Sequence, residues 1–506
     1  MRQRSRSLNT FAIPLFAFAF TVAVMFLYRP ASQALRGDPA LYEYIAQSIL
    51  RGQVPYRDVI DPKGPGAMYA SALAMLIGRA IGLGDIFGVR LFYIVMAGLL
   101  SAATYLVAEA YIENKWAAVL AFLIPMIPSH YALMMVSGTQ PKLLMMLFGM
   151  LSLLMVARDR PLLAGFFSML SCICWQPGLM FTGVAFLMFS RYLTFWRDRK
   201  AIKVVIGAVV PLGLVFLYFG IRGALFDLWA WAFTYDYSVF MPEGKRPVRA
   251  ALSHLAEIVI QVFGSNFVFL YLAAMGLLIF IALRVRVRLG GNRALQDPSL
   301  FKDAIVIPPV VYLIFCVINF QGGPDLIPFF AFIGIFAACF FLVAGRSLSG
   351  ARFRSSRGCP LVPSQVFPAA AALLVLATVV VVAASYRQEG RTLQEQYQDV
   401  EVIASLLKPE DKLYIHGPAE ILVLLHRPNM NPYIALNSGA DNFIASRTPG
   451  GFQAVIDQME AEAPEIVAMG RLRNVRHRAE LEEWVDEHYE RLPLPHLESV
   501  YIRKAQ

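Results

Sequence analysis

A polar stretch between the first two apolar segments of the chain carries side chains that could act together on a phosphate ester. The stretch covers residues 29–65, and the side chains in question are Asp38, Tyr42, Tyr56, Arg57, Asp58 and Lys63. A carboxylate can take the proton of an attacking hydroxyl, and cations can stabilise a departing phosphate. The mixture therefore suits a reaction in which a hydroxyl attacks and a phosphate leaves.

Asp38 also has a purely structural explanation. It precedes Pro39 and the segment ALYEYIAQSILRG, whose apolar residues recur at helical intervals up to Gly52. Aspartate is favoured as an N-cap and proline at the first helical position, so spacing alone favours capping over catalysis. We expect this helix to lie along the membrane surface. The charges that crowd residues 51–63 shift the balance towards a catalytic role.

The segment GDPALYEYIAQSILRGQVPYRDVIDPKGPG, residues 37–66, resembles the first external loop of the GT-C superfamily of membrane glycosyltransferases. Within that superfamily, the likeness is to the branch that contains protein O-mannosyltransferases and lipid A aminoarabinose transferases. The matching positions are Asp38, Tyr42, Ala46, Gly52, Pro55, Tyr56, Asp58, Lys63 and Pro65. The branch's Lys-Pro-Pro element is Lys63-Gly64-Pro65 here, a change that we expect to loosen the turn and keep the cation.

This resemblance implies an inverting transfer of a sugar from a polyprenyl-phosphate-linked donor to a lipid, glycan or protein acceptor on the outer face of the membrane. Asp38 would be the general base, and Lys63, together with Arg57, would hold the lipid phosphate. Further candidates for substrate binding from the same motif are Tyr42, Tyr56 and Asp58.

A second segment, NFQGGPDLIPFF at residues 319–330, resembles a stretch that lines the sugar pocket in relatives. Gln321 and Asp325 would contact the sugar or the phosphate there, although a Gly-Gly-Pro-Asp tight turn explains them equally well. Many members of the branch also carry a second acid before the fifth span, where this chain offers Gln140 and Lys142. The sequence shows no cofactor motif and no set of ligands for a divalent cation. It leaves open whether the protein needs such a cation.

The composition places these segments in a membrane protein. The chain is 58% hydrophobic and 16% charged, and its apolar runs are long enough to cross a hydrocarbon core of about 30 Å. The net charge of +10 comes from short Lys and Arg clusters between apolar runs, as in cytoplasmic loops, which argues against nucleic acid as a partner. The expected partners are the lipid-linked donor, membrane lipid and an envelope acceptor.

Twelve apolar segments are expected to form helices: 10–28, 66–82, 86–110, 116–136, 142–157, 162–175, 177–190, 204–221, 255–283, 305–320, 327–344 and 367–385. Because basic loops are expected to be cytoplasmic, residue 28 should lie outside and residue 158 inside. An odd number of crossings is then needed between them, yet four apolar segments lie there. Either the weakest segment, 66–82, does not cross, or the run 116–136 splits at its prolines. We therefore expect 11 to 13 crossings of a cell membrane, with the N-terminus cytoplasmic and the C-terminus outside.

The last part of the chain has an ordinary charge content and alternating patterns. Residues 411–417, 464–470 and 498–504 are predicted strands, and residues 449–463 and 477–492 are predicted helices. The predicted fold is an all-α polytopic transmembrane bundle over residues 1–385, GT-C-like by its resemblance, with a small extracytoplasmic α/β domain over residues 386–506.

Two other functions fit the same features. A transporter or flippase for a lipid-linked substrate could bind a phosphate without catalysis, but it would favour ionisable residues at mid-membrane depth. The acids Glu109, Asp227 and Glu257 all fall near the ends of predicted spans. A non-catalytic envelope scaffold would leave Asp38 as a helix cap. Loss of sugar transfer on replacement of Asp38 would distinguish an enzyme from both.

Overall fold

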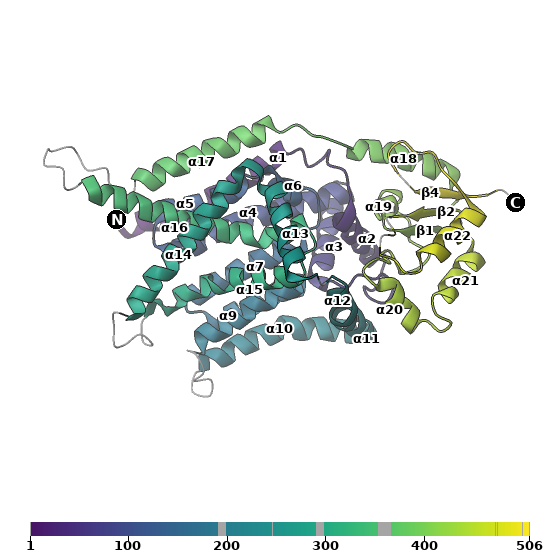
Figure 1. Ribbon diagram of the computed structural model, residues 1–506, viewed down its shortest axis with the longest axis horizontal. Helices are drawn as coiled ribbons and strands as arrows, with labels where there is room; N and C mark the ends of the chain where they lie inside the picture. Colours follow the sequence, from purple (N-terminus) through teal and green to yellow (C-terminus); the bar gives the residue numbers. More distant parts are fainter. Residues whose placement is uncertain are drawn as a thin grey trace.

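The computed structural model describes residues 2–190, 199–244, 246–289, 298–352, 366–470, 472, 474–497 and 499–504. Figure 1 shows a helical bundle with a small sheet-containing domain at the end opposite to the N-terminus. The helices of the bundle are α1 (Arg2–Leu27), α3 (Pro65–Ala80), α4 (Asp85–Ile112), α5 (Lys115–Leu123), α6 (Ser129–Val136), α7 (Pro141–Ala157), α8 (Pro161–Cys174), α9 (Leu179–Phe189), α10 (Arg199–Ile221), α13 (Val248–Phe263), α14 (Val268–Leu289), α15 (Ile307–Ile318), α16 (Ile327–Arg352) and α17 (Val366–Ser385). Each of the twelve apolar segments is helical, as predicted.

Length and hydropathy separate these helices into classes. Among the described residues, six helical stretches are long and apolar enough to cross a membrane, and α5 with α6 forms a further apolar pair bent by 74°. Four shorter apolar helices accompany them, whereas α3 belongs to none of these groups. The bend falls at Pro125 and Pro128, which cannot continue a regular helix. Whether α3 crosses and whether the bent pair crosses once or twice stay predictions, as does the count of 11 to 13 crossings.

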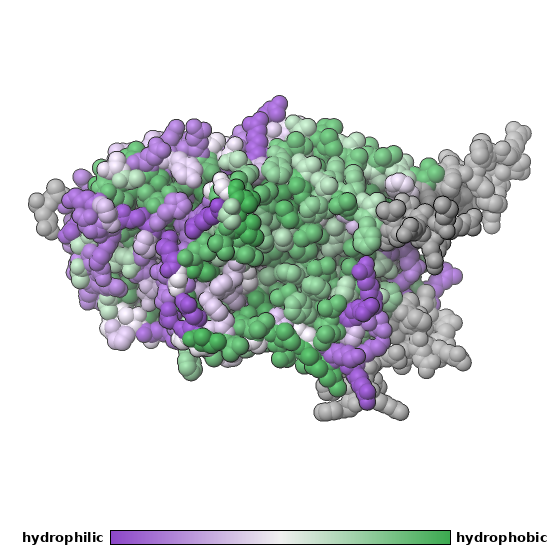
Figure 2. Space-filling view, turned by 180° about the vertical axis from the view of Figure 1, so that it is seen from behind, coloured by the Kyte–Doolittle hydropathy of each residue, from purple (hydrophilic) through white to green (hydrophobic). Residues whose placement is uncertain are grey.

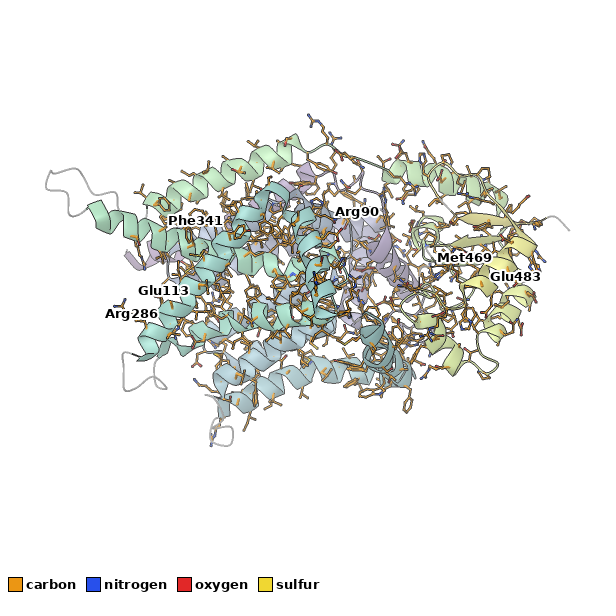
Figure 3. The ribbon with its side chains drawn as sticks, in the orientation of Figure 1. Arg90, Glu113, Arg286, Phe341, Met469 and Glu483 are labelled. Carbon is orange, nitrogen blue, oxygen red and sulfur yellow. The ribbon has the colours of Figure 1, made fainter. Side chains whose placement is uncertain are left out.

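The bundle has one basic end. Lys200 pairs with Asp159, Lys302 with Glu113 and Arg284 with Asp303, at nitrogen to oxygen distances of 2.7, 2.7 and 2.9 Å. Figure 3 shows Glu113 and Arg286 at this end, far from Met469 and Glu483 in the small domain. Between the two ends, the surface in Figure 2 carries a broad hydrophobic band. This arrangement is that of a membrane protein with polar ends.

The small domain contains a four-stranded sheet in the order β1-β2-β4-β3. Strand β1 (Leu413–His416) pairs in parallel with β2 (Ile466–Met469), and β4 (Val500–Arg503) pairs antiparallel with β2 and with β3 (Tyr489–Arg491). The three predicted strands and the helices α21 (Gln453–Glu462) and α22 (Arg478–His488) are confirmed. The prediction of helix over the end of 477–492 was wrong, because β3 pairs with β4 there. The other helices are α18 (Leu393–Leu406), α19 (Glu420–Leu425) and α20 (Ala440–Arg447).

One hydrophobic core joins the first polar loop to this small domain. Helix α2 (Gly37–Leu50) is buried along most of its length, and its tyrosines Tyr42 and Tyr44 share a core with the sheet. The Tyr44 hydroxyl accepts a hydrogen bond of 2.8 Å from the backbone of Asn429, and the Ile60 backbone donates to Pro432 at 3.1 Å. The small domain therefore covers α2, and the position of this helix along the membrane surface stays a prediction.

A second polar segment is also docked on the small domain. It consists of α11 (Leu225–Trp229), the π-helix η4 (Ala230–Phe240) and α12 (Met241–Gly244). The Tyr235 hydroxyl donates to the carbonyl of Ser438 at 2.9 Å, and the rings of Trp231 and Phe443 lie 5.0 Å apart. This hydrophobic core contains residues from both sides of the predicted boundary at residue 386. The division of the chain into two domains stays a prediction.

Close packing of α8 and α10 depends on two glycines. A Cβ atom at Gly165 would collide with the carbonyl oxygen of Val204, and one at Gly207 would collide with that of Leu162. Small residues allow membrane helices to approach closely, which is a main source of their packing energy. Gly213 lies in the same helix as Gly207, and a Cβ there would meet no heavy atom within 4 Å.

We predict that Gly207→Ala destabilises the protein by about 1–3 kcal/mol, because it forces the two helices apart. Thermal unfolding in detergent, followed by circular dichroism, measures the change. Gly213→Ala is the matched control and should shift stability by no more than about 1 kcal/mol. Equal melting temperatures for the two variants would contradict the packing argument.

Candidate functional site

A cavity of about 260 Å³ lies where the first polar loop meets the start of α7, the turn between α8 and α9, the π-helix η4 and the loop before α16. The polar side chains that line it include Asp38, Lys63, Lys142, Asp236, Gln321 and Asp325. We call this cavity the reaction pocket. Of the residues singled out from the sequence, it brings together Asp38, Lys63, Gln321 and Asp325.

Asp38 sits in the first turn of α2 and reaches the pocket. The helix begins at Gly37 with Arg36 as its N-cap residue, and no side chain caps it. The interpretation of Asp38 as the N-cap was therefore wrong. Within the described ranges the Asp38 carboxylate has neither a hydrogen bond nor an ion pair, and it is exposed in the pocket. It is thus free to accept a proton from a bound group.

Lys63 is held by its backbone, which leaves its ammonium group in the pocket. The Lys63 N–H donates to the Asp61 carboxylate at 2.8 Å, and the Tyr56 hydroxyl donates to the Lys63 carbonyl at 2.7 Å. The ammonium nitrogen lies 4.3 Å from the ring centroid of Phe240. This is a cation–π contact, which orients a cation without neutralising it.

The glycine after Lys63 has a steric role. A Cβ atom at Gly64 would collide with the carbonyl oxygen of Ile173 at the end of α8. The Gln176 side chain also donates to the carbonyl of Pro62 at 3.0 Å, so the loop is pressed against the turn between α8 and α9. The expectation that Gly64 loosens this turn was wrong, because the glycine permits a closer and more fixed contact.

Lys142, at the start of α7, is the second cation in the pocket. Its ammonium nitrogen lies 2.9 Å from the Asp325 carboxylate and 4.5 Å from the ring centroid of Trp175. The other carboxylate oxygen of Asp325 accepts a hydrogen bond of 2.7 Å from the backbone of Gln321. Both oxygens of Asp325 are therefore engaged, and this residue holds Lys142 and the loop before α16 in place.

Arg57 and Asp58 lie outside the pocket. Two nitrogens of the Arg57 guanidinium donate to Asp58 at 2.8 and 2.9 Å, and a third donates to the carbonyl of Arg222 at 2.9 Å. The hydrogen bond from Arg57 lowers the pKa of Asp58. Tyr42 is packed inside the shared core rather than against the cavity. The motif therefore separates into residues that reach the pocket and residues that fix the loop.

Two charged residues of the pocket, Lys142 and Asp236, lay outside the sequence-based candidates for binding. Lys142 had been noted only where relatives carry an acid, and Asp236 belongs to the π-helix η4. Burial raises the pKa of the Asp236 carboxyl above its usual value, and the positive charge of Lys63 offsets part of this rise. The only sequence signal for Asp236 was an acid within the aromatic run FTYDYSVF. Within the described parts of the chain, no three His, Cys, Asp or Glu side chains converge as a metal ion would require.

The arrangement of the whole chain matches solved structures of membrane glycosyltransferases. ArnT from Cupriavidus metallidurans, bound to undecaprenyl phosphate, superposes over 97% of both chains with a TM-score of 0.59 and 13% identity. The oligosaccharyltransferase of Archaeoglobus fulgidus covers 98% of this chain and 74% of its own, with a TM-score of 0.55 and 14% identity. The chain has the GT-C fold. At such identities the likeness establishes the GT-C fold alone.

Sequence comparison adds one partial relative. No family model matches the chain. A dolichol phosphate-mannose mannosyltransferase from Haloferax volcanii is 28% identical in an alignment of 200 residues that covers 37% of this chain. The chain spans 40% of the length of that curated relative. The roles of the individual pocket residues in this chain stay predictions.

We predict that ionisation of Asp61 lowers the stability of the protein. Burial raises the pKa of this carboxyl from 3.8 to about 6, with smaller contributions from Asp38 and Asp236 and an opposing one from Lys63. Because the folded pKa exceeds the unfolded value, stability falls as the pH rises from about 4 through about 6, by about 2–3 kcal/mol.

The measurement is thermal unfolding of the parent and of Asp61→Asn in detergent between pH 4 and pH 8. The asparagine carries no charge at any of these pH values, so the variant should gain stability relative to the parent as the pH rises. A difference between the two proteins that stays constant with pH would overturn the prediction.

Proposed function

We propose that this protein transfers a sugar from a polyprenyl-phosphate-linked donor to an acceptor hydroxyl, with inversion at the anomeric carbon. The observation that carries the proposal is the Asp38 carboxylate, which has no partner among the described residues and lies in the same pocket as the ammonium groups of Lys63 and Lys142. A base and a pair of cations are the two components that displacement of a phosphate by a hydroxyl needs.

The chemistry is a single displacement. The acceptor oxygen attacks the anomeric carbon from the face opposite to the phosphate, and the bond between that carbon and the phosphate oxygen breaks. The bonding electron pair leaves with the phosphate, whose charge Lys63 and Lys142 stabilise, and the acceptor proton passes to Asp38. Because one displacement occurs, the configuration inverts. Fixed positions for the base and the cations lower the entropic part of the barrier.

An apolar groove next to the pocket suits the carrier chain. It has a volume of about 300 Å³ and is lined by side chains from α13 to α16, including Val259, Phe263, Leu277, Leu326 and Phe336. Leu326 directly follows Asp325, which pairs with Lys142, so the groove begins beside the cations. A prenyl chain in the groove would leave water while its phosphate meets the lysines. The undecaprenyl phosphate of the ArnT structure and the name of the Haloferax relative support this assignment.

We place the reaction on the outer face of a cell membrane. Basic residues near the ends of spans resist translocation, so the end of the bundle that holds Arg158, Lys200 and Arg284 would be cytoplasmic, as would the N-terminus. The reaction pocket and the small domain would then be extracytoplasmic. The partners would be the lipid-linked donor, the surrounding membrane lipid and an acceptor in the cell envelope.

We predict that Asp38→Asn lowers the rate of sugar transfer by about 10²–10⁴-fold, because the acceptor proton loses its base. The assay uses protein reconstituted in lipid with a panel of radiolabelled polyprenyl-phosphate sugars and an envelope extract as the acceptor. Binding of the carrier lipid and the melting temperature should stay unchanged. Asp58→Asn is the matched control, since Asp58 lies in the same loop but outside the pocket.

Unchanged turnover by Asp38→Asn would remove this residue as the base. Specific binding of the carrier lipid without transfer from any donor would instead favour a transporter or flippase. If the protein showed no sugar transfer and no lipid binding, the remaining interpretation would be a non-catalytic envelope scaffold.

A second prediction separates the cations that reach the pocket from the one that does not. Lys63→Met and Lys142→Met should each weaken binding of a polyprenyl phosphate by about tenfold to a hundredfold, because each removes a charged contact worth about 1.5–3 kcal/mol. Arg57→Ala should change the affinity by less than about threefold, since Arg57 lies outside the pocket and binds Asp58 and the carbonyl of Arg222 instead. Binding of a fluorescent prenyl phosphate measures all three, and a larger loss in Arg57→Ala than in either lysine variant would contradict the assignment.

A further inference from the structure

A second polar pocket adjoins the reaction pocket on the side of the small domain. It has a volume of about 380 Å³ and shares Phe240, Asn319 and Gln321 with the reaction pocket. Its remaining wall includes Asn437 and Ser438, which precede α20 in the small domain. We call it the amide pocket. Because three residues line both cavities, a molecule in the amide pocket would lie directly beside the reaction pocket.

Most of the polar side chains that line the amide pocket, among the described residues, are uncharged. Four carboxamide side chains face it, those of Asn319, Gln321, Asn437 and Asn474. A carboxamide offers both donors and an acceptor, and a sugar hydroxyl likewise both donates and accepts. The only charged side chain among the described lining residues is Arg246, which is exposed. This lining suits a neutral polyhydroxylated molecule better than an acyl chain, which would require apolar walls.

Asn319 supplies an independent sign of a ligand. The residue is only 4% exposed, yet its side-chain oxygen has no hydrogen-bond partner among the residues that the structure describes. A buried polar atom without a partner costs about 1–3 kcal/mol, so native proteins rarely retain one without a use. Because Asn319 lines both pockets, a hydroxyl group bound there would satisfy the oxygen at their junction.

Aromatic rings complete the pocket. Phe320 and Phe240 both line it, and Phe320 is held by an edge-on contact with His254 at a ring distance of 5.7 Å. One face of a sugar ring is formed by C–H groups and packs on apolar surface, while its hydroxyls need polar partners. Small-molecule pockets combine these two features, with apolar walls and a few polar groups that fix orientation.

We propose that the amide pocket binds a sugar ring of the acceptor, which makes the acceptor a saccharide. This inference rests on the proposed function. The donor sugar is bonded to the phosphate, so it has to lie with that phosphate beside Lys63 and Lys142. The neighbouring pocket is then available to the second substrate, whose attacking hydroxyl crosses the shared wall towards Asp38. The new glycosidic bond would join the two sugars.

The test uses the double variant Asn437→Ala with Asn474→Gly. Neither residue lines the reaction pocket, and glycine tolerates the left-handed backbone of Asn474, where φ is 65°. Initial rates are measured in lipid with a radiolabelled polyprenyl-phosphate sugar and a panel of soluble gluco-, manno- and galacto-oligosaccharides as acceptors. Gln458→Ala, an exposed amide of α21 outside the pocket, is the control.

We expect the double variant to raise the KM for the saccharide acceptor at least tenfold, with an unchanged KM for the donor and unchanged hydrolysis of the donor by water. A raised KM for the donor would assign the pocket to the donor sugar and overturn the proposal. So would unchanged kinetic constants, or a parent protein that transfers only to peptides or sugar-free lipids.

A binding measurement separates this inference from the proposed function. Saturation-transfer NMR with the same oligosaccharides needs no turnover, and it should show contact with the parent protein and a loss of contact in the double variant. That result without any sugar transfer would reject the proposed function and retain a saccharide site. Transfer by the parent without a difference in saccharide binding between the two proteins would reject the site and retain the function.

Discussion

The site depends on keeping the Asp38 carboxylate in one pocket with the ammonium groups of Lys63 and Lys142 without allowing Asp38 to pair with either. Opposite charges at contact distance attract strongly where water is scarce, and a paired Asp38 would be a weaker base. The fold prevents this by giving each lysine another restraint. Lys142 is fixed by Asp325 and the Trp175 ring, and Lys63 by its own backbone and the Phe240 ring. Asp38 is left without a partner among the described residues.

These restraints require several backbone segments to approach more closely than side chains would allow. Gly64 lies against the carbonyl of Ile173, which sets the distance between Lys63 and the turn that carries Trp175. Gly138, which precedes α7 and Lys142 in the chain, also allows a close approach. Its φ of 131° is unfavourable for other residues, and a Cβ there would collide with the Glu43 carboxylate of α2. The first turn of α2, with Asp38, can therefore approach the segment that leads to Lys142.

The sequence predicted the parts of the structure that hydrophobicity determines. All twelve apolar segments are helices, and the alternating patterns located three strands, because these features repeat over many residues. The first loop was recognised as a site from its motif, yet the motif could not separate residues that face the pocket from those that turn away. Arg57 and Lys63 are equally basic in sequence, and only the folded structure shows that Lys63 lines the pocket while Arg57 turns away to Asp58. Lys142 and Asp236 were missed because they come from segments that only tertiary packing brings together.

The core shared by the first loop and the small domain also bears on the order in which the protein is made. Tyr42 and Tyr44 leave the ribosome early, but the residues of the small domain that share their core begin at residue 400. The loop cannot complete the burial of these rings until those later segments have been synthesised and have folded against it. A chain that stops at residue 385 would carry every residue of the reaction pocket and still lack this part of the core. Folding of the first polar loop therefore waits for segments that are synthesised after the whole helical bundle.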